Sequence, residues 1–355
     1  MNEKKISKLT IPNLLKESLE RYPDKNSLVF VGEKEYTYKE MGADVEKVAS
    51  LLSVLGISKG DKVAILSTNM PNWGVSFLAI SVLGAVAVPI LPDFHENEIK
   101  TIIEHSEAKL IFVSAGLYHS LGFESRKLVE QIILLDTFAV VPENANEEQL
   151  LEFPVSLPEK ALQNIWADVE EEDLASIIYT SGTTGSSKGV MLTQLNLAWT
   201  AQQCYSLQVV KPTDRLLSIL PLSHTLENTV GFLLPLKYGA SVHYLRKPPV
   251  PSVLLPAFNV VKPTIMLSVP LIIEKVFRSK IQPEFQKSAL VSKLYSIPFF
   301  RKILHKVAAQ KLHKTFGGHL HFFGIGGAKL DPAVERFLME GGFPYAIGYG
   351  LTETS

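Results

Sequence analysis

The chain has 355 residues, of which 46% are apolar and 20% are charged, as is typical of a globular protein with a large core. This length exceeds one ordinary domain and favours two subdomains. A net charge of −1 gives the molecule no overall attraction to nucleic acid. The single cysteine, Cys204, excludes an intramolecular disulfide framework and a cysteine-only metal site within one chain. It is interpreted as a neutral thiol and is consistent with a cytoplasmic location.

Residues 1–173 alternate between helical and strand patterns. Helices are expected at 8–21, 37–56, 73–83, 97–105 and 126–131, and strands at 28–30, 36–38, 61–66, 85–91, 109–113 and 132–135. Thr37 and Glu40 have the spacing of a capping box, and the strands at 28–30 and 36–38 are expected to pair. Helices that alternate with continuous apolar strands predict an α/β fold with a parallel sheet covered on both faces.

The segment 73–91 is uncharged over 19 residues, which is long enough to consider a membrane span. Gly84 and Pro89 interrupt it, and residues 85–91 have the pattern of a separate strand. A helix that ends near Gly84 and leads into a buried strand explains this segment without a lipid environment. The N-terminus also lacks the apolar core of a signal peptide.

A glycine loop is expected between two short buried strands, 176–179 and 190–192. Residues 180–189 combine three glycines and one lysine with several hydroxyl side chains. Glycines let backbone N–H groups approach a ligand closely, and the lysine adds a positive charge, so the loop suits a polyphosphate. A Ser/Gly-rich surface turn is the alternative. A Walker loop is disfavoured, because Ser187 precedes Lys188, Gly189 follows it, and a strand rather than a helix comes next.

Further elements are expected after the loop. They are a helix capped by Thr193, strands at 215–220, 241–245 and 263–270, helices at 228–237 and 271–280, a proline-rich turn at 247–251, a strand from 319 into a glycine turn at 326–328, and a helix from Asp331 to Gly341. Residues 142–173 are acidic and irregular. His319 and His321 are interpreted as structural, because no third metal ligand is evident.

Residues 274–321 carry ten Lys/Arg side chains against Glu274 and Glu284, with aromatic residues between them. The favoured interpretation is a helical insertion whose apolar face packs and whose charged face is solvated. An anionic membrane surface, the phosphates of a large cofactor, or single-stranded nucleic acid are alternative partners for this segment.

Three motifs in a fixed order carry a family resemblance: the glycine loop, Gly326-Gly327-Ala328, and the run 348–353 with the sequence Gly-Tyr-Gly-Leu-Thr-Glu. Together they resemble the adenylate-forming (AMP-binding) superfamily. Residues 220–227 and the long insertion resemble its long-chain fatty acyl-CoA synthetase branch. The resemblance implies doubly wound, mostly parallel sheets with covering helices, as in the large N-terminal domain of that fold, with subdomains at 1–173 and 174–355 and a basic helical insertion at 274–321.

The resemblance also implies a two-step reaction, in which a fatty acid and ATP give acyl-AMP and pyrophosphate, and coenzyme A then displaces AMP. The implied phosphate-binding residues are Thr180, Ser181, Gly182, Thr183, Thr184, Gly185 and Lys188. Thr184 and Glu353 match positions that approach Mg²⁺, and Thr352 matches the contact to the α-phosphate. The implied adenine site comprises Gly326, Gly327, Ala328, Tyr349 and Gly350. His224 matches a histidine that lines the acyl site, so His224, Thr352 and Glu353 are the candidate catalytic residues.

The chain departs from the family pattern at three points. Ser187 stands where the family usually has proline, and Asn228 stands where some members place a tryptophan gate. The chain ends at Ser355, before the family's ribose-binding aspartate, hinge and C-terminal lid domain, so a fragment with weak nucleotide binding and poor turnover is expected. An acyl-AMP ligase that loads a carrier protein, a non-catalytic nucleotide-binding module and a membrane-surface protein stay as alternatives. Acyl chain length and oligomeric state stay open.

Overall fold

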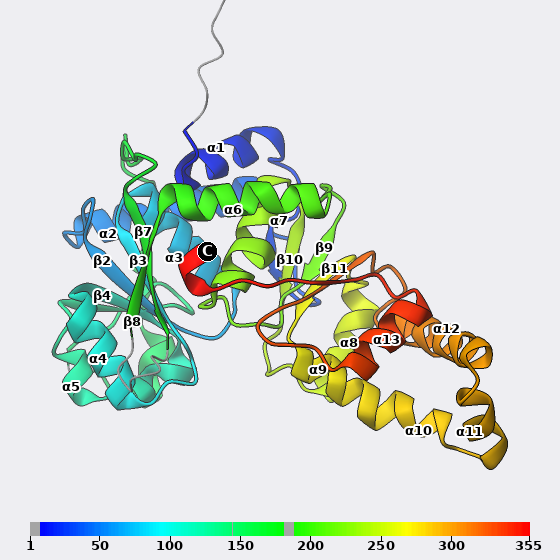
Figure 1. Ribbon diagram of the computed structural model, residues 1–355. Coiled ribbons are helices and arrows are strands. Elements are labelled where there is room, and N and C mark those ends of the chain that lie inside the picture. Colours follow the sequence, from blue (N-terminus) through cyan, green and yellow to red (C-terminus); the bar gives the residue numbers. More distant parts are fainter. Residues whose placement is uncertain (1–7, 144, 181–187) are drawn as a thin grey trace, which may run out of the picture. The chain divides into compact units, whose positions relative to one another are not determined.

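The computed structural model describes residues 8–143, 145–180 and 188–355 (Figure 1). The chain forms two compact units. The first comprises Met1–Thr213, Pro221–Tyr244 and Leu351–Ser355, and the second comprises Asp214–Leu220 and Leu245–Gly350. Among the described residues, no helix combines the length and the apolar character needed to cross a bilayer.

The first unit contains a sheet whose described strands follow the order β6-β5-β4-β2-β3-β7-β8. Its strands are β2 (Lys62–Leu66), β3 (Val86–Ile90), β4 (Ala108–Val113), β5 (Gln131–Leu134), β6 (Ala139–Val140), β7 (Leu174–Thr180) and β8 (Lys188–Thr193). All neighbours are parallel except β5 with β6 and β7 with β8. The expected α/β fold with mostly parallel strands is therefore confirmed. The expected subdomain boundary after residue 173 falls inside this unit, because β7 pairs with β3.

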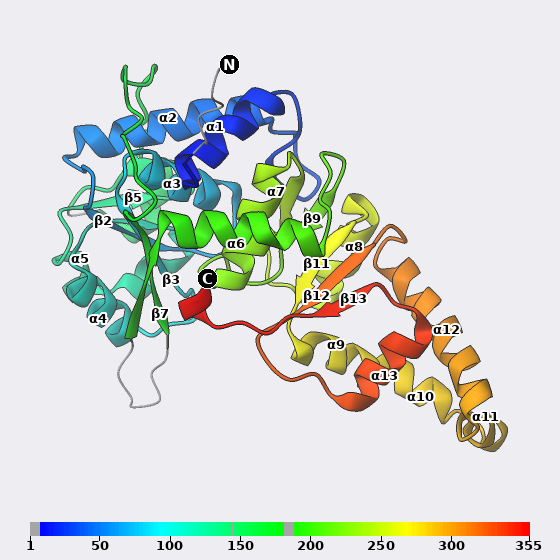
Figure 2. The same cartoon turned by 45° about the horizontal axis from the view of Figure 1, so that its top comes forward.

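Helices cover both faces of this sheet. They are α1 (Ile11–Arg21), α2 (Tyr38–Val54), α3 (Pro71–Val82), α4 (Glu96–Ser106), α5 (Phe123–Arg126), α6 (Gln194–Leu207) and α7 (Leu234–Lys237), with short 3₁₀ segments η1 (Ala115–Leu121) and η2 (Glu147–Glu152). Figures 1 and 2 show α2 and α3 on one face and α4 and α5 on the other. On the α4 side, Ile99, Ile102 and Ile103 pack in one core with alternate residues of β2, β3 and β4. Apart from Lys62 and Lys109, the remaining residues of those strands are buried on the opposite face, as a doubly covered parallel sheet requires.

The uncharged segment 73–91 folds as predicted, into α3 followed by β3. Gly84 separates the two elements with a φ of +67°, a conformation that strongly favours glycine. From Trp73 onward every residue of α3 is buried, which explains why the segment carries no charge.

Two sequence-based expectations in the first unit are wrong. Residues 28–30 form β1 (Leu28–Phe30), but β1 pairs in parallel with β10 (Ser241–Tyr244), and residues 36–38 contribute only an isolated bridge from Thr37 to Asn26. Thr37 instead caps α2, and the Glu40 side chain accepts its backbone N–H at 2.8 Å, as the capping box predicted. The helix expected at 126–131 ends at Arg126, because the Glu130 N–H already donates to Lys109 of β4.

The second unit is built on four parallel strands among its described residues: β9 (Arg215–Leu217), β11 (Ile265–Ser268), β12 (Phe322–Ile325) and β13 (Tyr345–Ile347). Its helices are α8 (Pro251–Val261), α9 (Pro270–Val276), the π-helix η4 (Phe277–Ile281), α10 (Gln282–Phe285), α11 (Ala289–Tyr295), α12 (Pro298–Thr315) and α13 (Pro332–Gly341). Helix α8 was not expected, because residues 247–251 were predicted only as a proline-rich turn. Pro251 occupies the first helical turn, where its missing N–H has no cost.

Candidate functional site

The glycine loop joins the two antiparallel strands β7 and β8, and the strand register places Thr180 opposite Lys188. The loop residues Ser181, Gly182, Thr183, Thr184 and Gly185 lie outside the described part of the chain. A strand follows Lys188, which confirms the spacing argument against a Walker loop. The prediction that both flanking strands are buried is wrong for β8. This strand lies at the sheet edge, and Met191 is 66% exposed.

Tyr179 anchors the end of β7 at the entrance to the loop. Its hydroxyl lies 2.7 Å from Nδ1 of His105, in the last turn of α4, and the two rings meet edge to face. Gly189 is the residue opposite Tyr179 on β8, and a methyl group there would come within 2.9 Å of Cγ2 of Ile177. The glycine therefore lets β8 pack closely over β7 where the loop begins.

His224 is held near the carboxyl end of β3. The Leu222 N–H donates to Oδ1 of Asn69 at 2.9 Å, and the Ser223 hydroxyl donates to the carbonyl of Ile90 at 3.0 Å. Ile90 is the last residue of β3, and β3 runs parallel to β7, whose last residue is Thr180. His224 and the glycine loop thus follow the same edge of the sheet, where ligands bind in open α/β folds.

The His224 imidazole is free to act on a ligand. Its ring is exposed and makes no hydrogen bond with any residue that the structure describes, so the view that it satisfies a local backbone group is not supported. Surrounding protein atoms partly desolvate the ring and lower its pKa below the ordinary value. At neutral pH the imidazole is therefore uncharged and offers one N–H donor.

A buried polar stretch follows His224. It belongs to η3 (Glu227–Leu233), a π-helix, which is a rare element that often marks functional sites. Asn228 is 1% exposed, and neither polar atom of its amide has a hydrogen-bond partner among the described residues. The position of the family's tryptophan gate is therefore filled here by a small, buried amide.

Thr352 and Glu353 lie in η5 (Thr352–Thr354), which belongs to the first unit and packs against β8. The Ser355 hydroxyl fixes this segment on α6, 3.0 Å from Oγ1 of Thr200 and 3.2 Å from the carbonyl of Asn196. The Glu353 carboxylate is exposed and forms no ion pair within the described ranges. These residues are therefore brought to the strand that begins with Lys188.

The candidate adenine-site residues cluster in the second unit. Gly326-Gly327-Ala328 follow β12, and Gly348-Tyr349-Gly350 follow the neighbouring parallel strand β13. The Gly348 N–H donates to Ile325 at 2.9 Å, which ties the two turns together. Gly327 has a φ of +88°, where a side chain would be strained. Tyr349 is 94% exposed, which excludes a role as a core residue and leaves its ring open to stacking.

His321 has a structural partner, because its Nε2 lies 2.8 Å from Oδ1 of the buried Asp214. No group of three or more metal-ligating side chains occurs in the described ranges. Burial raises the pKa of the Cys204 thiol, which disfavours the reactive thiolate.

The site predicted from the sequence did not include the positioning residues Asn69, Ser223 and His105. Asn69 comes shortly after the end of β2, and Thr180 ends β7, so the rule that ligand sites gather at the carboxyl ends of parallel strands could have identified Asn69. The contacts of Ser223 and His105 join residues more than 70 positions apart and leave no local signal.

Comparisons with known proteins identify the family and the fold of the chain. The family model for AMP-binding enzymes matches residues 15–355. The chain is 28% identical to the long-chain-fatty-acid–CoA ligase FadD15 of Mycobacterium bovis, over 90% of this chain and 56% of that protein. It is 26% identical to long chain acyl-CoA synthetase 3 of Arabidopsis thaliana, over 90% and 52% of the two chains. The chain thus spans about half the length of these curated relatives.

Two solved structures show the same fold. ATP-bound MatB from Rhodopseudomonas palustris matches with a TM-score of 0.73 and 22% identity, over 96% of this chain and 60% of that one. The inhibitor-bound N-terminal domain of FACL13 from Mycobacterium tuberculosis matches with a TM-score of 0.72 and 22% identity, over 97% and 76%. The chain therefore belongs to the family of AMP-binding, adenylate-forming enzymes and has the fold of their N-terminal domain.

Proposed function

We propose that this chain is the ATP- and acyl-binding portion of a fatty acid–CoA ligase. In the first step a fatty carboxylate oxygen attacks the α-phosphorus of ATP, and pyrophosphate leaves. In the second step the thiol of coenzyme A attacks the acyl carbonyl, and AMP leaves. The relatives named as long-chain acyl-CoA ligases support this choice of substrate and acceptor, at 26–28% identity.

The observation that carries the proposal is that the carboxyl ends of the parallel strands β3 and β7 lie at the same edge of the sheet. A free, neutral imidazole at His224 and the start of the glycine loop at Thr180 both follow this edge. The first step brings the fatty carboxylate and the triphosphate, both anions, together. It therefore needs preorganised hydrogen-bond donors that stabilise the negative charge of the transition state. A neutral imidazole N–H beside an attacking carboxylate meets that need, and the Lys188 ammonium suits the departing pyrophosphate.

The second unit is proposed to hold the adenine. The exposed Tyr349 ring offers a flat apolar surface for stacking, and Gly326 and Gly327 let backbone groups approach the base closely. Ala328 and Gly350 complete this proposed adenine site. Thr352 is proposed to donate its hydroxyl to the α-phosphate.

The chemistry of Glu353 fits Mg²⁺, because its carboxylate is exposed and forms no ion pair with a described residue. Magnesium is usually bound by one or two carboxylates together with substrate phosphates and water. Thr184 is the second proposed ligand and lies outside the described residues. When bound, the ion would neutralise charge on the phosphates.

Nucleotide binding by the 355-residue protein tests the first part of the proposal. We expect titration calorimetry with ATP and Mg²⁺ to detect binding. Tyr349→Ala should weaken it about tenfold, because one stacking contact is worth about 1–3 kcal/mol. Met339→Ala, at another exposed position of the second unit, is the matched control. Absence of binding, or equal loss in both variants, would contradict the proposed adenine site.

Substrate and acceptor need a separate assay. ATP–pyrophosphate exchange with fatty acids of increasing length reports adenylation, and thioester formation with coenzyme A or a phosphopantetheine carrier reports the acceptor. We expect exchange only with fatty acids and transfer only to coenzyme A. Transfer only to the carrier would identify an acyl-AMP ligase. Nucleotide binding without exchange in the complete natural protein would indicate a non-catalytic module.

A further inference from the structure

A helical arm, which we define as α10, α11 and α12, forms one end of the second unit. Figures 1 and 2 both show these helices extending away from the strands of that unit, with α11 at the far end. The arm accounts for most of the basic segment 274–321, which is mainly helical, as expected. It has no place in the adenylation chemistry proposed above.

The inner face of α12 packs as expected. His305, Ala309 and Leu312 are buried on this face, and α12 packs against α13. Arg301 adds two charge-assisted hydrogen bonds to Glu340 of α13, at 2.8 and 3.0 Å. The outer face is therefore fixed in orientation.

The outer face of α12 differs from the solvated, charged face that was expected. Phe299, Ile303 and Val307 recur every four residues, so they form one stripe along the helix. Their side chains are 68%, 46% and 61% exposed. Leu290 of α11 and Ile297, just before α12, are also exposed. Side chains of this size rarely form a continuous exposed stripe unless the surface meets a partner.

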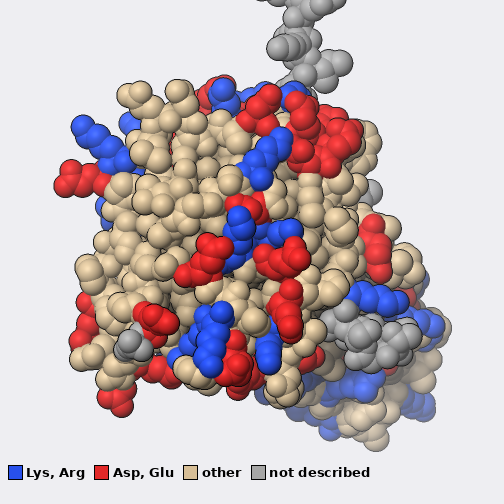
Figure 3. Space-filling view, turned by 90° about the vertical axis from the view of Figure 1, so that its left-hand side faces the viewer, with Lys and Arg blue, Asp and Glu red and all other residues tan. Residues whose placement is uncertain are grey.

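Lysines border this stripe on both sides. Helical geometry places Lys302 and Lys306 on one flank and Lys311 on the other. None of the three forms an ion pair within the described part of the chain. The sequence contains no acidic residue between Glu284 and Asp331. The first unit has a different surface, because the face in Figure 3 shows Lys and Arg beside Asp and Glu.

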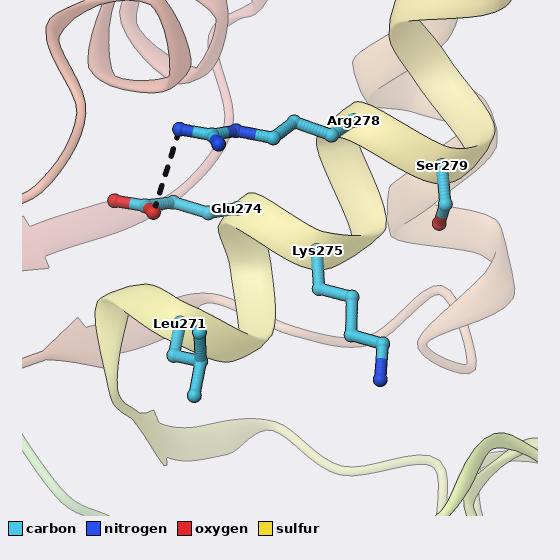
Figure 4. Close-up of a pocket in the computed structure, with 5 residues that line it drawn as sticks. All are labelled: Leu271, Glu274, Lys275, Arg278 and Ser279. Carbon is cyan, nitrogen blue, oxygen red and sulfur yellow. Dashed lines mark ion pairs between the residues drawn. The ribbon is translucent and has the colours of Figure 1, made fainter.

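A groove on α9 and η4 offers no comparable site for a soluble anion. Its volume is about 390 Å³, and it is lined by Leu271, Glu274, Lys275, Arg278 and Ser279 (Figure 4). Arg278 is already neutralised, because it lies 2.8 Å from Asp331 and 4.0 Å from Glu274. Lys275 is therefore the one basic side chain of this groove without a described ion pair, whereas the arm carries Lys302, Lys306 and Lys311.

We propose that the outer face of α12 docks on the surface of an anionic phospholipid bilayer. An interfacial helix places its apolar residues at the boundary between headgroups and acyl chains, while flanking lysines reach lipid phosphates with their long side chains. The apolar stripe of α12 with its lysine borders has this arrangement. Because α11 and α12 contain no acidic side chain, an anionic surface meets no like-charge repulsion there.

Vesicle flotation with the full chain tests this proposal. The anionic probe is a vesicle of phosphatidylcholine with about 30% phosphatidylglycerol, and the neutral probe is a vesicle of pure phosphatidylcholine. Binding to each would be measured in about 50 mM and about 500 mM salt. We expect binding to the anionic vesicles that falls at high salt. The double variants Phe299→Ser/Val307→Ser and Lys302→Glu/Lys306→Glu should each weaken it about tenfold or more.

Two matched controls separate the arm from general surface effects. Val260→Ser/Met339→Ser removes exposed apolar side chains elsewhere in the second unit, and Lys34→Glu/Lys39→Glu makes the same change of charge in the first unit. Both should bind like the unchanged protein. Absence of vesicle binding, equal binding to both vesicle types, or arm variants that bind normally would overturn the proposal. So would arm variants that only abolish self-association in ultracentrifugation, since the face would then contact a second copy.

Discussion

Single side chains at the edge of the first unit's sheet carry most of the candidate chemistry, and their neighbours determine their state. Ser223 and Asn69 position the segment before His224, and His105 holds Tyr179 beside the glycine loop. None of these neighbours is a proposed ligand contact. Their effects should therefore appear first in stability and only then in activity.

Tyr179→Phe tests the anchor of β7. The variant removes the hydroxyl that lies 2.7 Å from His105 and should lower the free energy of unfolding by about 1 kcal/mol. Urea unfolding followed by circular dichroism measures the change. Tyr205→Phe is the control, because the Tyr205 hydroxyl forms no hydrogen bond with a described residue. An equal loss in both variants would show that the contact with His105 does not stabilise the hairpin.

Asn228→Leu tests the cost of the buried amide in η3. Two buried polar atoms without described partners are removed, so the free energy of unfolding should rise by about 1 kcal/mol. Asn228→Asp keeps the shape and should lower it, because a carboxylate would be buried beside Glu227. Thermal unfolding at pH 7 measures both. A marked loss of stability in Asn228→Leu would mean that a bound water or ligand satisfies the amide.

At the scale of elements, the packing of α12 on α13 contains a buried titratable cluster. His305 lies with its Nδ1 2.8 Å from Glu340, and its Nε2 lies 3.0 Å from the Tyr295 hydroxyl of α11. Burial lowers the His305 pKa and outweighs Glu340, which raises it, while Arg301 and Arg336 lower it further. The Glu340 pKa is held low, chiefly by Arg301.

This cluster predicts a pH dependence of stability. Because the folded pKa of His305 lies below its unfolded value of about 6.5, the unfolded state binds more protons as the pH falls through that value. The contribution of His305 to the free energy of unfolding should thus be complete at pH 8 and should decline from about pH 7 towards pH 5. His305→Gln should flatten this decline, whereas exposed His119→Gln should not. Denaturant midpoints across this pH range provide the measurement, and an unchanged slope in His305→Gln would contradict the assignment.

For the whole molecule, ligand binding should raise the stability of the chain. A ligand that binds only the folded state adds about 2.7 kcal/mol when its concentration is one hundred times its Kd. We expect ATP with Mg²⁺ to raise Tm in a concentration-dependent way. Lys188→Ala and Glu353→Gln should each reduce this shift without changing the Tm of the free protein, because both side chains are exposed and form no ion pair with described residues. A shift that persists in both variants would remove these residues from the proposed phosphate and metal site.

Much of the fold followed from local patterns. The capping boxes at Thr37 and Thr193, the separation of α3 from β3 at Gly84, and the proline start of α13 depend on hydrogen bonds and backbone angles within a few residues. The wrong pairing of residues 28–30 has a non-local cause, because they pair with a strand more than 200 positions away. Helix α8 was missed for a local reason, since Pro251 starts the helix where only a proline-rich turn was expected.

The sequence by itself determined the family, because the glycine loop, the Gly-Gly-Ala turn and the run 348–353 each meet a local backbone or chemical requirement. Only the tertiary structure decided which of these segments share a unit, that Tyr349 is exposed, and that the His224 ring is free. It also showed that the outer face of α12 is apolar as well as basic. Exposure and pairing depend on contacts between distant parts of the chain, and local composition does not contain them.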